Sequence, residues 1–235
     1  MRFFIDFQPE IGSAVLLSRE DAHHCNVLRY RVGDELTLCD GAGNDYICRL
    51  DKIGRDEVQC IVLSRFLSTG EPSARLEVFC AIPKGDKAAH IVRKATELGA
   101  AGISFFSSER TIGKLKSSDR YSIIAREAAM QSGRGIIPPL RLYESFEDAL
   151  TSAETLELRL FCWEEERVHT LKNALNGKAP ASVAIVTGAE GGFTTEEAQL
   201  AESRGFELIT LGTRILRCET APLAVLSAIT LLGDF

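Results

Sequence analysis

Two strand-and-loop units near the end of the chain constrain its fold more than any other feature. The first strand, Ser182–Thr187, is a continuous apolar run typical of a parallel strand buried on both faces, and three glycines follow it within five residues. The second strand, Glu207–Leu211, ends in Gly212 and a loop that runs to Glu219. Glycines at such places let a ligand approach the backbone closely. We therefore expect an α/β domain with a ligand site at the ends of its strands.

Helix signals follow both loops. Thr194 is suited to an N-cap, Glu197 completes a capping box three residues later, and Gly205 follows the expected end of the helix. Pro222 suits the first turn of a last helix, which continues apolar to Leu232. The pattern of strand, loop and helix thus occurs twice in succession.

The glycine-rich segments lack the motifs of several common ligand sites. The chain has no G-x-G-x-x-G entering a helix and no G-x-x-x-x-G-K-[ST], which argues against a dinucleotide fold and a P-loop. It also has no G-x-S-x-G, which argues against a hydrolase of that type. A single glycine loop can serve only as a tight turn, but two such loops favour a ligand that is not a polyphosphate.

A polar segment with glycine and proline, Ser68–Ser73, divides the chain into two expected domains. Residues 1–70 contain short strands separated by turns and predict a small β-barrel domain. Residues 74–235 alternate buried strands with helices and predict the α/β domain. The clearest elements are the strands Glu35–Cys39, Tyr46–Leu50, Val58–Val62, Leu76–Ile82 and Leu158–Trp163, and the helices Asp86–Leu98 and Asp119–Ser132.

Composition predicts a cytoplasmic protein without a membrane span or a metal. No apolar run reaches the roughly 18 residues that a membrane helix needs, and the apolar start is interrupted too soon for a secretory signal. The seven cysteines contain no C-x-x-C, and no histidine has metal-ligand spacing, so we expect reduced thiols and neither a disulfide nor zinc.

Charge is distributed unevenly along the chain. The formal net charge is −6, yet residues 75–141 hold 12 basic against 6 acidic residues. Such a segment can line a groove that follows nucleic-acid phosphates, although a solvated surface with ion pairs has the same composition. The acidic remainder predicts weak binding to bulk nucleic acid and a preference for one structured target.

Several motifs, in order, resemble those of one family. They are His23–Arg29 with Gly33–Asp34, Lys84–Lys87, Lys94–Gly99, Ser108–Arg110, Gln131–Arg134, Gly188–Gly192, Leu211–Gly212 and Arg217–Ala221. Over nearly its whole length the chain resembles the RsmE family of SPOUT methyltransferases. The resemblance implies a C-terminal α/β domain with a trefoil knot, a PUA-like N-terminal domain, a homodimer, and methylation of uridine N3 in 16S ribosomal RNA with S-adenosylmethionine as the cofactor.

The resemblance also implies site residues. The cofactor would be bound by Thr187, Gly188, Glu190, Gly191, Gly192, Leu211, Gly212, Ile215, Leu216, Arg217, Thr220 and Ala221. RNA would be bound by His24, Arg29, Arg31, Lys84, Arg110, Lys114, Gln131 and Arg134.

Three residues are the catalytic candidates. Deprotonation of uracil N3 spreads negative charge onto two carbonyls, and a guanidinium stabilises such charge, so we assign Arg134 and Arg217 to this role. Glu190 is a candidate general base. Phosphate anchoring is an equal alternative for Arg134, and Glu190 could instead cap a helix or pair with an arginine.

The chain departs from the family pattern at two places. Ala189 stands where the family usually has proline, and Met130 where it often has glutamate. The first departure loosens a turn, and the second removes any role of a carboxylate at that place. These departures keep one alternative open, a non-catalytic RNA-binding factor for ribosome assembly on the same fold.

Overall fold

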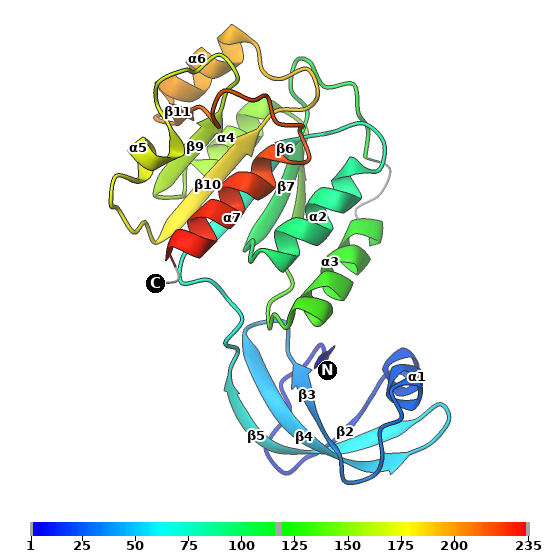
Figure 1. The fold of residues 1–235 in the computed structure, drawn as a ribbon. Coiled ribbons are helices and arrows are strands. Elements are labelled where there is room, and N and C mark those ends of the chain that lie inside the picture. The colour runs from blue at the N-terminus through cyan, green and yellow to red at the C-terminus, as the bar shows by residue number, and fades with distance from the viewer. Residues whose placement is uncertain (1, 116–118, 234–235) are drawn as a thin grey trace. The chain divides into compact units, whose positions relative to one another are not determined.

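The computed structural model describes residues 2–115 and 119–233, and the chain forms two compact units (Figure 1). One unit comprises Met1–Glu71 and Ala129–Ile137, and the other comprises Pro72–Ala128 and Pro138–Phe235. The first unit therefore includes residues 129–137, which were predicted to lie within the α/β domain of residues 74–235.

The first unit is built on a five-stranded sheet in the order β1-β3-β4-β5-β2. β1 is parallel to β3 and the other neighbours are antiparallel. Among the described residues the edge strands β1 and β2 do not pair with each other. The strands are β1 (Arg2–Phe4), β2 (Ala14–Leu16), β3 (Glu35–Cys39), β4 (Asn44–Ile53) and β5 (Val58–Leu67), with the helix α1 (Arg19–Val27) after β2.

Alternating side chains explain this sheet. Leu36 and Leu38 of β3 and Tyr46, Cys48 and Leu50 of β4 are buried in one core. Period-two burial of this kind is typical of a strand with one face toward a core. The three strands predicted in this part of the sequence are confirmed, whereas β1, β2 and α1 were not predicted.

The second unit has a six-stranded parallel sheet in the order β11-β9-β10-β6-β7-β8. The predicted α/β class is confirmed. Its strands are β6 (Arg75–Ala81), β7 (Gly102–Phe106), β8 (Leu140–Tyr143), β9 (Leu158–Cys162), β10 (Ser182–Thr187) and β11 (Glu207–Ile209). Its helices are α2 (Lys87–Glu97), α3 (Asp119–Ser132, whose last turn belongs to the first unit), α4 (Phe146–Ala153), α5 (Leu171–Leu175), α6 (Thr195–Ser203) and α7 (Ala221–Gly233).

Local signals located the elements around the two loops well. β10 has the predicted bounds, and α6 begins after Thr194 with the predicted capping box to Glu197. β11 is shorter than predicted and ends at Ile209. Beyond Ile209 the chain changes its partner: Thr210 forms an isolated parallel bridge with Thr170, and its N–H donates to the carbonyl of His169 at 2.8 Å.

A cluster of aromatic side chains lies in the core of the second unit. Phe106, Phe146, Phe161 and Phe193 are buried, and the ring centroids of Phe161 and Phe193 are 4.3 Å apart. α7 packs on β10, β6 and α2 and buries Val225, Leu226 and Ile229. Phe193 directly follows the loop of residues 188–192, and α7 directly follows the loop that ends at residue 220. These contacts therefore anchor the C-terminal end of each loop.

Candidate functional site

A cavity of about 530 Å³ lies at the carboxyl ends of β9, β10 and β11 in the second unit. Because these strands are parallel and adjacent, the loops that follow them meet at one edge of the sheet. Three loops form most of the wall: the glycine loop (residues 188–192), the C-terminal loop (residues 210–220) and the β9 loop (residues 163–170). The volume is in the range of pockets that enclose a small organic ligand.

The glycine loop is held at both ends. The N–H of Gly192 donates to the carbonyl of Ala189 at 3.1 Å, which closes a tight turn without a proline. Phe193 then enters the aromatic cluster and Thr194 caps α6. Arg110 Nη1 donates to the carbonyls of Gly191 and Phe193 at 3.0 and 3.1 Å. The loop thus has a defined backbone path along the cavity.

Gly192 has the strictest requirement for glycine in this loop. Its φ is +64°, in the left-handed region that side chains rarely adopt. A Cβ at this position would lie 1.8 Å from Oε1 of Glu164, which also lines the cavity. Any side chain here must move the loop or the carboxylate.

The C-terminal loop is fixed where it joins α7. The carbonyl of Arg217 accepts the N–H groups of Thr220 and Ala221 at 2.8 and 2.9 Å, which forms the first turn before the helix. The side chains of Arg217 and Ile215 are exposed, the latter by 85%. This loop therefore presents both a guanidinium and an aliphatic surface at the cavity.

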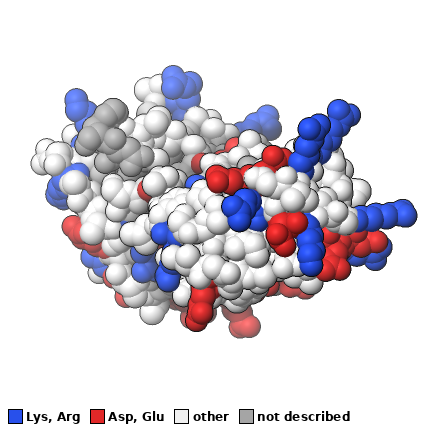
Figure 2. Space-filling model, turned by 90° about the horizontal axis from the view of Figure 1, so that it is seen from below, with Lys and Arg blue, Asp and Glu red and all other residues white. Residues whose placement is uncertain are grey.

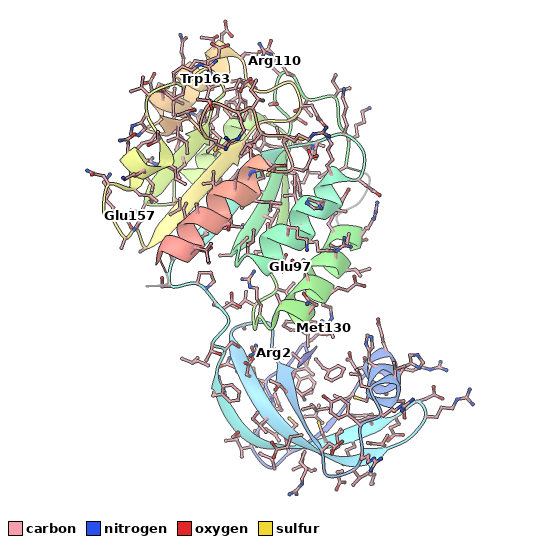
Figure 3. The ribbon with its side chains drawn as sticks, in the orientation of Figure 1. Arg2, Glu97, Arg110, Met130, Glu157 and Trp163 are labelled. Carbon is pink, nitrogen blue, oxygen red and sulfur yellow. The ribbon has the colours of Figure 1, made fainter. Side chains whose placement is uncertain are left out.

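The β9 loop and α2 supply a part of the wall that the sequence did not predict as a site. Cys162, Trp163, Glu164 and Arg167 line the cavity from β9 and its loop, and Lys87 lines it from α2. Figure 3 labels Trp163 among the loops at this end of the unit. Its Nε1 is buried without a hydrogen-bond partner among the described residues. The strand before Trp163 was predicted, but its place between β10 and β11 was not.

An ion-pair cluster joins two of these loops to α2. Lys87 Nζ lies 2.8 Å from Oε1 of Glu190 and 3.4 Å from Oε2 of Glu219. Glu190 also accepts the backbone N–H of Lys84 at 3.1 Å. The side chains of Lys87 and Glu190 are 31% and 28% exposed. We call Lys87, Glu190 and Glu219 the lysine cluster.

The lysine cluster sets the protonation of its members. Partial burial raises the pKa of Glu190, but hydrogen bonds from Lys87 and Lys84 outweigh it and bring that pKa below the usual range. The pKa of Glu219 is lowered in the same way, with burial opposed by hydrogen bonds that include the one from Lys87. The pKa of Lys87 is raised, chiefly by its bond to Glu190. A carboxylate with a lowered pKa is a weak proton acceptor, which favours a role of Glu190 in holding the loop.

The cavity contains nearly all of the residues predicted to bind the cofactor. Thr187, Gly188, Glu190, Gly191, Gly192, Leu211, Gly212, Ile215, Leu216, Arg217 and Ala221 line it. Thr220 does not line it, and its carbonyl accepts the N–H of Ala224 at the start of α7. The binding of a cofactor by these residues stays a prediction.

Arg134 lies in the first unit and does not line the cavity. Its side chain is 2% exposed, and its Nε and Nη2 donate to the carboxylate of Glu71. Oε1 of Glu71 also accepts the N–H groups of Gly135 and Ile136, each at 3.1 Å. Glu71 thus holds three successive residues of the segment 129–137, and this geometry favours a structural role for Arg134.

The other residues predicted to bind RNA are divided between the units. In the first unit His24 is half-buried in α1, while Arg29, Arg31 and Gln131 are exposed. In the second unit Lys84, Arg110 and Lys114 are exposed. Figure 2 shows a face on which basic and acidic side chains are interspersed. Contact of these residues with RNA stays a prediction.

The described residues include no group of three or more His, Cys, Asp or Glu side chains arranged to hold a metal ion. Over the same residues no helix has the length and hydropathy needed to cross a membrane. All seven cysteines are buried free thiols, and burial raises the pKa of Cys218, beside the cavity, to about 12.

Comparison with known families gives two matches. The RNA methyltransferase domain matches residues 70–230, and the RNA methyltransferase PUA domain matches residues 17–63. Together they extend over both units and include all three loops of the cavity.

Relatives match over nearly the whole chain. The ribosomal RNA small subunit methyltransferase E of Bacillus subtilis is 33% identical, over 97% of this chain and 95% of the relative. The protein of the same name from Synechocystis is 32% identical, over 94% of this chain and 74% of the relative. The crystal structure of that methyltransferase from Neisseria gonorrhoeae bound to S-adenosylmethionine has a TM-score of 0.85 and 30% identity, and covers 100% of this chain and 98% of its own.

Proposed function

We propose that this chain, which belongs to the ribosomal RNA small subunit methyltransferase E family of RNA methyltransferases, methylates N3 of a uridine in 16S ribosomal RNA. The methyl donor is S-adenosylmethionine, as in the similar protein from Neisseria gonorrhoeae. The observation that carries the proposal is the cavity whose walls are the glycine loop and the C-terminal loop, within the segment that matches the methyltransferase domain.

The residues of the cavity suit this cofactor. Leu211, Ile215, Leu216 and Ala221 provide apolar surface for a nucleoside base, and the glycine loop allows its backbone to approach the ligand. The cofactor supplies an electrophilic methyl group on a sulfonium. The protein orients the donor and acceptor and excludes water, and the fixed backbone of the glycine loop serves that purpose.

The acceptor is a base whose imide nitrogen must lose a proton. Arg217 is our candidate for stabilising the negative charge on the uracil carbonyls, because its guanidinium is exposed at the cavity while its backbone is fixed by two hydrogen bonds. Glu190 is engaged by Lys87 and Lys84 and has a lowered pKa. We therefore assign Glu190 to positioning of the loop rather than to proton transfer.

We further assign RNA binding to the first unit, through its PUA domain, and place the enzyme in the cytoplasm as a homodimer acting on the small ribosomal subunit. Paired copies normally bury one self-complementary patch. The side chain of Leu231 on α7, which is 64% exposed, is an apolar candidate for such a patch.

The test is transfer of a labelled methyl group from S-adenosylmethionine to unmodified small subunits and to naked 16S RNA, followed by nucleoside mass spectrometry. We expect label in 3-methyluridine. Gly192→Ala should weaken cofactor binding about three- to tenfold, because its Cβ would displace the Glu164 carboxylate from its place on the cavity wall. Gly177→Ala is the matched control, since Gly177 also has a positive φ of +72° but no atom near the added Cβ.

Each outcome has a distinct meaning. Label in another nucleoside would overturn the assignment to uridine N3, and RNA binding without cofactor binding would favour a non-catalytic assembly factor. Equal cofactor affinity in Gly192→Ala and Gly177→Ala, measured by calorimetry, would contradict a cofactor in contact with Gly192 and Glu164.

A further inference from the structure

The wall of the cavity carries an excess of positive charge that the described residues do not neutralise. Four of its residues are cationic and two are anionic. Lys87 is paired with Glu190, but the side chains of Arg167, Arg214 and Arg217 make no ion pair or hydrogen bond with the described residues. All three arginines are exposed.

Two of these arginines come from different loops. Arg214 belongs to the C-terminal loop and Arg167 to the β9 loop. The position of Arg167 is well defined along the backbone, because Oε1 of Glu166 accepts the N–H groups of Arg167, Val168 and His169 at 2.9, 2.6 and 2.9 Å. These bonds lower the pKa of Glu166 and keep its carboxylate turned toward the backbone.

Oε1 of Glu166 is thereby engaged by the backbone, and its carboxylate makes no ion pair with Arg167. The remaining carboxylate on the wall, Glu164, lies against the backbone of Gly192. Arg167 and Arg214 consequently stand at the cavity with free guanidinium donors. An exposed guanidinium with no partner is suited to a bidentate bond with a phosphate.

We propose that Arg167 and Arg214 form an anion site at the cavity that holds a phosphate of the RNA strand next to the target nucleotide. The inference rests on the proposed function, since a base that is methylated in this cavity brings its flanking phosphates to the same rim. Contacts to phosphate position a nucleic acid without reading its sequence. The two arginines therefore act on the affinity and placement of the RNA and leave its recognition to other residues.

The carboxylate of the cofactor is the other anion that this chemistry would bind. Two measurements distinguish an RNA phosphate from the carboxylate of the cofactor. They are the salt dependence of binding to 16S RNA and the dissociation constant of S-adenosylmethionine by calorimetry. The variants are Arg167→Gln, Arg214→Gln and the double variant. Lys178→Gln removes one charge from the same unit at a residue outside the cavity wall and is the control.

We expect the double variant to weaken binding to 16S RNA and to reduce the slope of log K against log salt concentration by about 0.7 to 0.9, the value for one neutralised phosphate. Each single variant should show a part of both effects. The KM for RNA should rise in parallel while the dissociation constant of S-adenosylmethionine stays within twofold. Weaker cofactor binding with an unchanged RNA salt slope would assign the site to the cofactor and overturn the proposal. RNA affinity and slope equal to those of Lys178→Gln would also overturn it. Because RNA binding is measured without turnover, the outcome is independent of whether methyl transfer to uridine occurs.

Discussion

Each unit of this protein contains a cluster of ion pairs that joins segments distant in the sequence, and the two clusters differ in burial. In the first unit Glu71 pairs with Arg134, whose side chain is 2% exposed, and also binds two backbone N–H groups. In the second unit Lys87 pairs with Glu190 and Glu219, and these three side chains are 18 to 31% exposed.

The difference indicates different roles. A buried arginine that loses its carboxylate keeps an uncompensated charge away from water, so the group formed by Glu71 and Arg134 has one stable arrangement. The lysine cluster is partly hydrated and lies beside a cavity, where its loops can adjust at little cost. We expect the first cluster to determine stability and the second to determine ligand affinity.

The largest effect should follow from Arg134→Met. This change leaves the Glu71 carboxylate without its cation and should lower the free energy of unfolding by about 3 kcal/mol. The measurement is urea unfolding followed by circular dichroism. Arg65→Met is the control, because Arg65 is an exposed arginine of the same unit with hydrogen bonds to Asn44. The double variant Glu71→Gln with Arg134→Met should be less destabilised than the sum of the single changes.

Arg134→Met also tests the catalytic role predicted from the sequence. Unchanged stability together with loss of methyl transfer would assign Arg134 to the substrate and remove the contrast between the clusters. Loss of stability with residual transfer in the folded fraction would support the structural role.

An intermediate effect should follow from Lys87→Met. Without the ammonium, Glu190 and Glu219 repel each other and the two loops lose a link, so S-adenosylmethionine should bind roughly three- to tenfold more weakly. Lys87→Arg should restore most of the affinity. Lys94→Met on the same helix is the control, since Glu97, at 2.7 Å, is the only ion-pair partner of Lys94 among the described residues. Affinity that is unchanged or higher in Lys87→Met would mean that the carboxylates attract the cationic cofactor directly.

Local signals in the sequence were sufficient for much of the site. The apolar run before Gly188 and the capping box at Thr194 determine a strand and a helix within a few residues, so the loop between them could be located. Gly212 follows the second predicted strand and was located in the same way, whereas Arg217 was assigned to the site from the resemblance to a family. The trefoil knot rests on the resemblance to a family alone and stays a prediction, because the rules of chain connection exclude threading by default.

Local sequence signals do not predict the order of the strands in a sheet or the contacts between residues that lie far apart in the sequence. Trp163 and Arg167 join the cavity only because β9 lies between β10 and β11, which no local pattern encodes. Arg134 follows a helix and a glycine, and its partner Glu71 is 63 residues away. Its burial depends on that pairing, so the sequence could suggest a functional arginine but not its environment.

The smallest expected effect is the pH dependence of the stability that the lysine cluster contributes. The pKa values of Glu190 and Glu219 are lowered in the folded state, so their pairing with Lys87 adds stability above the unfolded pKa of about 4.3. That contribution is lost as the pH falls through the lower folded values. The melting temperature of the wild type should exceed that of Lys87→Met by a few degrees at most at pH 7, and the gap should close as the pH falls below about 4. A gap that persists at low pH would contradict this account, because it would show that the stabilisation by Lys87 does not depend on ionised Glu190 and Glu219.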